Sequence, residues 1–131
     1  MILGVEFCMV VTNSIAALEL YEKIFEVDRV AVNDLGMGSS GVIFNIYNAR
    51  FQLMDQNIEN KFVSPKQSDS LSKWINVAVP DIQKTYDAAI AAGCEEIYPV
   101  AQTDDPKVKT ATFGDEYGHM WMLHEIDYPA Q

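Results

Sequence analysis

The sequence has few basic residues and no long apolar run. Nine Lys and Arg residues face 19 Asp and Glu residues in a chain of 131, which gives a net charge of −10. Nucleic-acid binding needs Lys and Arg to neutralise phosphates, so this balance argues against it, and against an anionic membrane surface too. No apolar run reaches the roughly 18–20 residues of a membrane span, and no basic segment precedes one at the N-terminus. We therefore expect a cytoplasmic protein with no nucleic-acid or membrane partner.

Cysteine and histidine are also scarce. Cys8 and Cys94 lie in apolar surroundings without the spacing of metal ligands, which favours two reduced core residues over a disulfide. His119 and His124 are separated by an odd number of positions, so on one strand they would point to opposite faces. Cys8 has no histidine nearby in the sequence, and no other nucleophile with a base partner is visible.

The first half of the chain predicts one helix among four strands. Asn13 or Ser14 can cap a helix that runs to about Glu26, because apolar residues then recur at helical spacing. Strands are expected at about residues 3–12, 28–33, 42–47 and 49–55, with a tight hairpin around Asn48. A polar surface loop covers residues 56–71.

The second half repeats this order. A strand at 72–79 precedes a helix capped by Asp81 and stopped at Gly93, and three strands follow. Shifting the chain by about 68 positions places Asn13 on Asp81. We predict an α+β fold: two βαβββ modules form curved mixed sheets around a cleft, with the helices outside. The modules span about 1–56 and 72–127, joined by a linker at 57–71 within a single domain, 1–131.

Two segments carry a family resemblance. Residues 16–25 read AALELYEKIF, and residues 113–123 read FGDEYGHMWML. They resemble the "EALxFYxxxF" helix and the "DPFGHRWML" ending of the PhnB-like branch of the vicinal oxygen chelate superfamily, which includes glyoxalase I, bleomycin- and fosfomycin-resistance proteins and extradiol dioxygenases. The resemblance implies paired modules, an open cavity and a homodimer. Glu116, Tyr117 and Met120 depart from the ending, where Met120 replaces an arginine.

Metal-dependent members of that superfamily place His or Glu on the first and last strands of both modules. The matching positions here are Glu6, Gln52, Trp74 and Met122. An indole cannot ligate a metal, and a thioether is a poor ligand for the hard or borderline cations this chemistry uses. The sequence therefore predicts no metal of the family type and no cofactor, and it disfavours metal-dependent catalysis.

Strand parity predicts which side chains line the cleft. The candidate ligand-binding residues are Glu6, Asn45, Tyr47, Gln52, Trp74, Asn76, Met120, Met122 and His124. An indole and flexible thioethers suit a small apolar or planar molecule. Glu6 is the best candidate for a catalytic group, and it serves as a base if burial raises its pKa. Less specific interpretations remain: Trp74 packs in the core, Glu6 is solvated or internally paired, and His124 is a partly exposed residue at a strand end.

Three functions are compatible with these residues. The first is a small-molecule-binding protein of the glyoxalase and bleomycin-resistance type without the usual metal site. The second is a lyase- or dioxygenase-like enzyme with a non-standard metal or an acid–base site built on Glu6 and His124. The third is a regulatory or interaction module whose cleft is vestigial.

Overall fold

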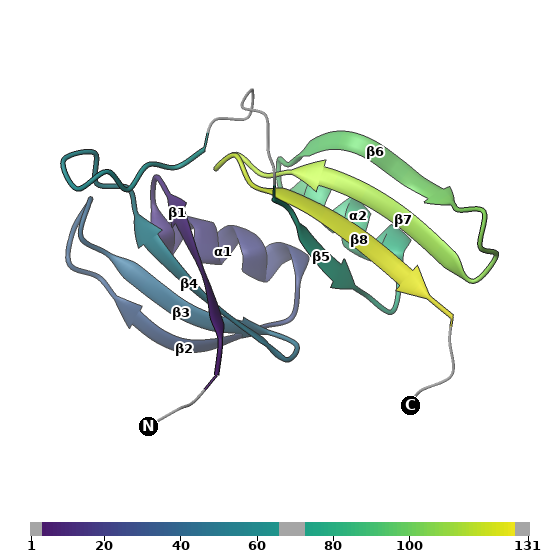
Figure 1. The fold of residues 1–131 in the computed structure, drawn as a ribbon, viewed down its shortest axis with the longest axis horizontal. Helices are drawn as coiled ribbons and strands as arrows, with labels where there is room; N and C mark the ends of the chain where they lie inside the picture. The colour runs from purple at the N-terminus through teal and green to yellow at the C-terminus, as the bar shows by residue number, and fades with distance from the viewer. Residues whose placement is uncertain (1–3, 66–72, 128–131) are drawn as a thin grey trace. The chain divides into compact units, whose positions relative to one another are not determined.

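The computed structural model describes residues 4–65 and 73–127, and the chain divides into two compact units, Met1–Pro65 and Lys66–Gln131. Within the described residues each unit contains one helix and one four-stranded mixed sheet (Figure 1). The predicted α+β class and the repeated β-α-β-β-β order are both confirmed. In the described part of the chain no helix has the length and apolar character needed to cross a membrane.

The first unit is built around a sheet with the strand order β1-β4-β3-β2. In chain order its elements are β1 (Glu6–Val11), α1 (Ser14–Ile24), β2 (Val27–Asn33), β3 (Gly41–Ile46) and β4 (Ala49–Asp55). β1 runs parallel to β4, and the other neighbouring strands are antiparallel. Helix α1 packs against one face of this sheet, mainly over β3 and β4.

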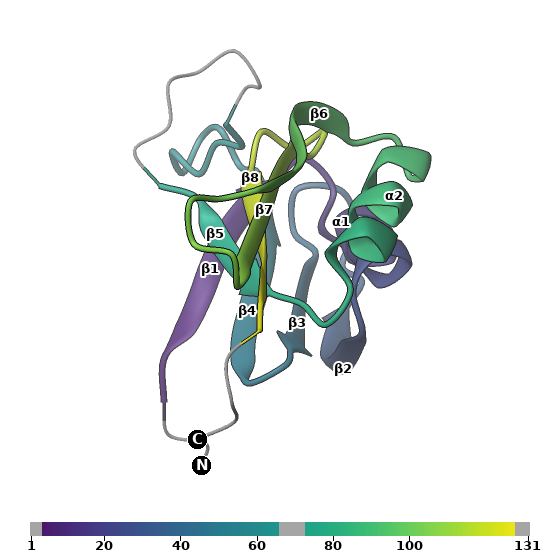
Figure 2. The same cartoon turned by 90° about the vertical axis from the view of Figure 1, so that its right-hand side faces the viewer.

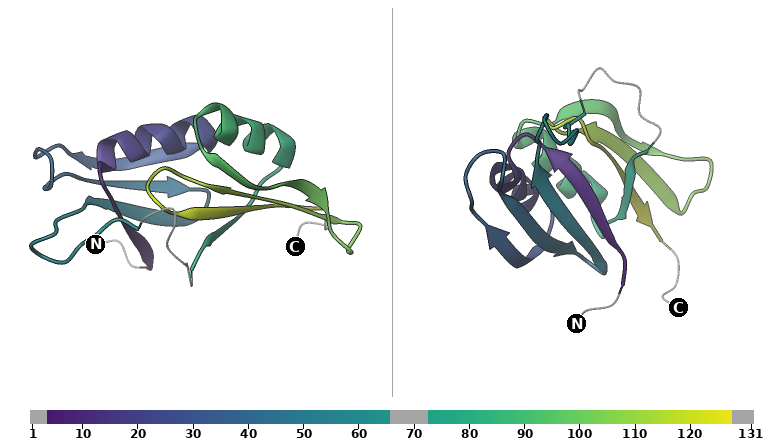
Figure 3. Two further views of the ribbon diagram at one scale, coloured as in Figure 1. Left: turned by 90° about the horizontal axis from the view of Figure 1, so that it is seen from above. Right: turned by 60° about the vertical axis from the view of Figure 1, so that its left-hand side comes forward.

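The second unit repeats this plan with the strand order β5-β8-β7-β6. Its elements are β5 (Ile75–Ala78), α2 (Ile82–Ala91), β6 (Glu95–Gln102), β7 (Val108–Gly114) and β8 (Met120–Ile126). β5 is parallel to β8, and α2 packs over β6, β7 and β8 (Figure 2). Seen from above, each helix lies on one side of its own sheet (Figure 3).

Both helices begin at the predicted caps. The Asn13 side chain accepts a hydrogen bond from the Ala16 N–H at 3.0 Å, and the Asp81 side chain accepts one from the Lys84 N–H at 3.2 Å. These caps satisfy N–H groups that the first turn of a helix leaves without a backbone partner. Their separation of 68 positions is the shift that the sequence predicts.

The repeat extends to a contact that the sequence does not reveal. Asp55, at the end of β4, accepts a hydrogen bond from the Ser14 N–H at 2.7 Å. Glu125, near the end of β8, accepts one from the Ile82 N–H at 3.1 Å. In each unit a carboxylate on the last strand therefore holds the N-terminus of the helix, where the helix dipole favours negative charge.

Each sheet is buried on the face beneath its helix. In the first unit this face carries the buried side chains Met9, Val11, Val42, Phe44, Ile46, Phe51 and Leu53. In the second it carries the buried side chains Val77, Val79, Ala111, Phe113, Trp121 and Leu123. The alternation along each strand leaves the opposite face half-exposed.

The turn between β7 and β8 is organised by one buried carboxylate. Asp115 accepts hydrogen bonds from the Tyr117 N–H at 2.9 Å and the His119 N–H at 3.0 Å through one oxygen. Its other oxygen accepts a bond from the Trp121 indole N–H at 2.9 Å. Trp121 has no exposed surface and stacks on Phe113 with ring centroids 6.4 Å apart. Residues 115–119 therefore form a turn whose geometry is set from within by Asp115.

Two expectations from the sequence are corrected. Tyr47 lies in the two-residue turn after β3 with φ 52°, because a tight reversal needs such a residue, and so it does not share the strand face of Asn45. Strand β5 begins at Ile75, so Trp74 precedes it. Part of the expected linker, residues 66–72, lies outside the described residues.

We expect Asp115→Asn to lower the free energy of unfolding by about 2–3 kcal/mol, because an amide cannot accept all three hydrogen bonds and opposes one N–H with another. Urea denaturation followed by circular dichroism measures this loss. The exposed Asp104→Asn is the matched control and should change stability by less than about 0.5 kcal/mol. Equal stability of the two variants would contradict the role given to Asp115.

Asp55 should make stability depend on pH. Burial raises the pKa of Asp55, but hydrogen bonds from Ser14, Gly38 and Ser40 outweigh burial and leave its pKa below the ordinary value. A lowered pKa means that the stabilisation is full above the unfolded-state value of about 4 and is lost as the pH falls through the lower folded value.

We therefore expect Asp55→Asn to be less stable than the parent protein at pH 7, with a difference that shrinks below about pH 4. Urea denaturation at a series of pH values measures this difference. Asp34→Asn, an exposed change in the same unit, serves as the control. A difference for Asp55→Asn that stays constant down to pH 2 would contradict the assignment.

Candidate functional site

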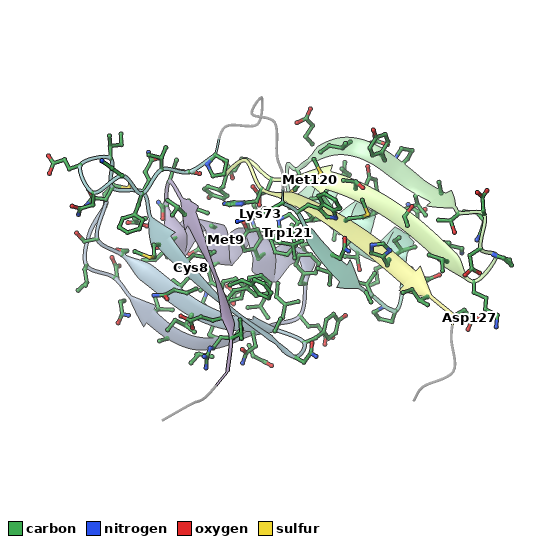
Figure 4. The ribbon with its side chains drawn as sticks, viewed as in Figure 1. Cys8, Met9, Lys73, Met120, Trp121 and Asp127 are labelled. Atoms are coloured by element: carbon green, nitrogen blue, oxygen red, sulfur yellow. The ribbon has the colours of Figure 1, made fainter. Side chains whose placement is uncertain are left out.

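The candidate residues of the first unit lie on the sheet face that α1 does not cover. The register places Glu6 of β1 beside Arg50 of β4, and Arg50 beside Asn45 of β3. In the next row Cys8 lies beside Gln52. Cys8 and Met9, both labelled in Figure 4, are successive residues of β1 and therefore project to opposite faces. The structure thus brings Glu6, Asn45 and Gln52 onto one half-exposed surface, without Tyr47.

Arg50 is a site residue that the sequence interpretation missed. Its Nε lies 3.0 Å from Glu6 Oε2, and the side chains are 21% and 32% exposed, respectively. Glu6 is therefore internally paired, one of the interpretations left open by the sequence. Arg50 has the same strand parity as Gln52, so parity could have placed it on this face. Its pairing with Glu6 depends on the parallel register of β1 and β4, which the sequence does not reveal.

The second unit has an open face built around Trp74. The register places Asn76 beside Met122 on β8, and Met120 and His124 share the parity of Met122. Trp74 is 51% exposed, and its indole N–H donates a hydrogen bond to the Asn76 side chain at 2.9 Å. This exposure excludes packing in the core. The hydrogen bond orients the indole and uses its one polar group, so its aromatic faces are what a ligand would meet.

The two histidines have different surroundings. The backbone N–H of His119 donates a hydrogen bond to Asp115, so the main chain of His119 is part of the turn. His124 lies within β8 rather than at its end, beside Ala78 and Thr110 on the neighbouring strands. Its Nε2 is buried and has no hydrogen-bond partner in the structure. His124 is therefore a polar group on the open face whose bonding capacity is not used within the protein.

Both cysteines are free, and neither is a ready nucleophile. Cys94 is buried as expected, but Cys8 is exposed, because its parity places it on the face without a helix. Burial, together with the charges of Asp115 and Glu116, raises the pKa of Cys94 to about 12. Burial, and then the charge of Glu6, also raises the pKa of Cys8. Since the thiolate is the reactive form, both thiols are unreactive near neutral pH.

The four positions that match the metal site of the superfamily do not suit a divalent cation. Glu6 already pairs with Arg50, and Gln52 offers only a neutral amide. The other two positions hold the Trp74 indole, bonded to Asn76, and the Met122 thioether. Among the described residues, no group of three or more His, Cys, Asp or Glu side chains is arranged to hold a metal.

A pocket of about 370 Å³ lies beside the N-terminus of α1, away from the open face. The side chains of Asn13, Glu19, Asp34 and Met37 contribute to its walls. The loop that forms one wall is held by Asp55, which accepts hydrogen bonds from Gly38 and Ser40. The sequence did not predict this pocket, because its walls come from segments with no recognisable motif.

Comparison with known proteins identifies structures but no sequence relatives. No protein-family profile matches the chain, and no curated protein does. The fosfomycin resistance protein FosX from Mesorhizobium loti is similar over 95% of this chain and 92% of its own, with a TM-score of 0.67 and 19% identity. FosX from Listeria monocytogenes, complexed with Mn(II) and sulfate, is similar over 95% of this chain and 91% of its own, with a TM-score of 0.71 and 15% identity.

TioX from Micromonospora sp. ML1 is similar over 94% of this chain and 99% of its own, with a TM-score of 0.70 and 16% identity. At these identities the likeness shows a shared fold, and the function has to be argued from the site. The chain shares its fold of two βαβββ units with FosX and TioX.

Proposed function

We propose that this chain is a small-molecule-binding protein that lacks the metal site of its superfamily, and that it belongs to the PhnB-like branch. The single observation that carries the proposal is the exposed indole of Trp74, held in place by Asn76. Exposing a large aromatic surface to water costs free energy, so an oriented and half-exposed indole is better suited to a ligand than to packing.

The chemistry around Trp74 favours a planar ligand. Because the indole N–H is bonded to Asn76, the aromatic faces remain for stacking and for cation–π contact. Met120 and Met122 add thioethers on the same strand face, and Met side chains adapt to irregular apolar shapes. The net charge of −10 attracts cations over longer distances. A planar aromatic molecule, neutral or cationic, fits these features best.

Binding is favoured over catalysis by the state of the reactive groups. The thiols are held in the protonated form, and Glu6 is occupied by Arg50 rather than free to act as a base. Two of the similar structures are fosfomycin resistance proteins, and one of them is complexed with Mn(II). We do not transfer that activity, because Trp74 and Met122 stand at two of the positions that match metal ligands. The homodimer and the cytoplasmic location expected from the sequence stay predictions.

An acid–base enzyme is the second candidate, and His124 is the observation that favours it. Its unpartnered Nε2 lies on the open face of β8 and has capacity to exchange a proton with a bound molecule. A binding protein without catalysis would use the same Nε2 atom to form a hydrogen bond with the bound molecule. Turnover of a bound ligand, abolished by His124→Gln without loss of binding, would favour the enzyme.

Tryptophan fluorescence tests the binding proposal directly. The chain has two tryptophans, and only Trp74 is exposed, while Trp121 has no exposed surface. We expect a planar aromatic cation such as proflavine to quench the Trp74 emission in a saturable way, because stacking requires contact. Trp74→Phe should remove the saturable component and leave the Trp121 emission.

Free N-acetyltryptophanamide at the same absorbance corrects this titration for inner-filter effects. Thermal unfolding with the same probe gives an independent readout, since a ligand bound only to the folded state raises Tm. Saturable quenching that persists in Trp74→Phe would place the ligand elsewhere. If neither quenching nor a Tm shift appears with a panel of planar aromatic probes, the binding proposal fails and a vestigial cleft is favoured.

Metal addition should leave the protein unchanged. We expect Mn²⁺, Zn²⁺ or Ni²⁺, added at about 100 µM, to change the Tm of the protein by less than about 1 °C. The physical reason is that an indole, a thioether, an amide and an ion-paired carboxylate are together a poor donor set. Differential scanning fluorimetry with and without EDTA measures the shift. Stabilisation by several degrees that EDTA reverses would contradict the proposal.

A further inference from the structure

Two Arg–Glu pairs in the first unit have different geometries. Arg29, on β2, donates to Glu22 through both Nε, at 2.8 Å, and Nη2, at 2.6 Å. This fork uses both carboxylate oxygens and completes a bidentate pair on the protein surface. Such a pair has little remaining capacity for another partner.

The pair on the open face is not completed in this way. Arg50 Nε lies 3.0 Å from Glu6 Oε2, but it is buried without an aligned hydrogen bond to any partner. Within the described residues, the contact between the two side chains is an ion pair and not a fork. A guanidinium carries five N–H donors and a carboxylate about four acceptor positions, so both groups keep unused capacity. Burial of unsatisfied polar groups costs free energy, which a fitting ligand recovers.

The position of the pair defines what would fit. Glu6 and Arg50 are register partners on adjacent parallel strands, whose backbones lie about 4.8 Å apart, so an acceptor and a donor stand side by side on one surface. Asn45 follows Arg50 in the same row, and Gln52 lies on the same face of β4. The side chains of these residues end in polar, planar groups, and the opposite charges of Glu6 and Arg50 nearly cancel.

We infer that the Glu6–Arg50 pair of the first unit recognises a neutral planar amide edge on a small molecule, such as a carboxamide or lactam. The ligand carbonyl accepts a hydrogen bond from Arg50, and its adjacent N–H donates one to Glu6. An anionic group would meet the charge of Glu6, and a cationic group would meet that of Arg50, so each costs more than the neutral edge. This assignment rests on the proposed binding function and adds a substrate class to it.

Three probes of one shape separate the alternatives. Naphthalene-2-carboxamide, naphthalene-2-carboxylate and naphthalene-2-carboxamidine differ at the polar group, which is neutral, anionic or cationic. We expect the carboxamide to bind about tenfold more tightly than the other two, since it alone can bond to both Glu6 and Arg50 without placing a like charge beside either. Two-dimensional NMR measures the affinities and reports the Nε–H signal of Arg50, which should shift with the carboxamide.

Matched variants test the residues. Arg50→Gln and Glu6→Gln should each remove the preference for the carboxamide when the same three probes are titrated. Arg29→Gln alters an Arg–Glu pair of the same unit that is exposed and already complete, and it should keep the full preference. Backbone NMR spectra of all three variants establish that each is folded before affinities are compared.

Each other result overturns the inference in a distinct way. Tightest binding of the carboxylate would make Arg50 a simple anion site, and tightest binding of the amidine would make Glu6 the anchor. Equal binding of all three probes, or none, would remove the amide assignment. Quenching of Trp74 by planar probes then decides the wider proposal: if it persists, the binding function stands without this site, and if it is absent, both fail.

Discussion

A single short helix can cover only one face of a four-stranded sheet, and this limit shapes each unit of the chain. Beneath α1 and α2 the strand faces carry fully buried apolar side chains. On the opposite faces the same strands carry half-exposed residues. Because side chains alternate along a strand, every core residue fixes the direction of its neighbours. The candidate site residues on the strands are therefore a consequence of where the helices pack.

Carboxylates that accept hydrogen bonds from backbone N–H groups keep these helices and turns in place. Asp55 and Glu125 hold the N-termini of α1 and α2 from the last strand of each unit. Asp115 holds the turn that delivers β8, and it also bonds the indole of Trp121 at the centre of the core. Asp55 and Asp115 tolerate burial because N–H donors surround them. The acidic residues of this chain thus serve two purposes, since a few organise the interior while most remain exposed.

Sharing a fold with FosX and TioX does not by itself assign a metal chemistry to this chain. The positions that match metal ligands hold an ion-paired carboxylate, an amide, an indole and a thioether. Such groups supply dispersion contacts and hydrogen bonds more readily than they coordinate a divalent cation. Arg50 also places a cationic side chain beside Glu6, which occupies one of those positions.

The sequence alone determined the element order, the caps at Asn13 and Asp81 and the face on which most candidate residues lie. Those features follow from local spacing and from side chains that bond within three residues. It could not show that Trp74 precedes its strand with an exposed indole, or that Tyr47 belongs to a turn. Only the tertiary structure decided that Glu6 meets Arg50 and that Asp55 reaches Ser14, residues 44 and 41 positions apart. Such partnerships depend on the register of strands that are distant in the chain, and register is set by packing of the whole sheet.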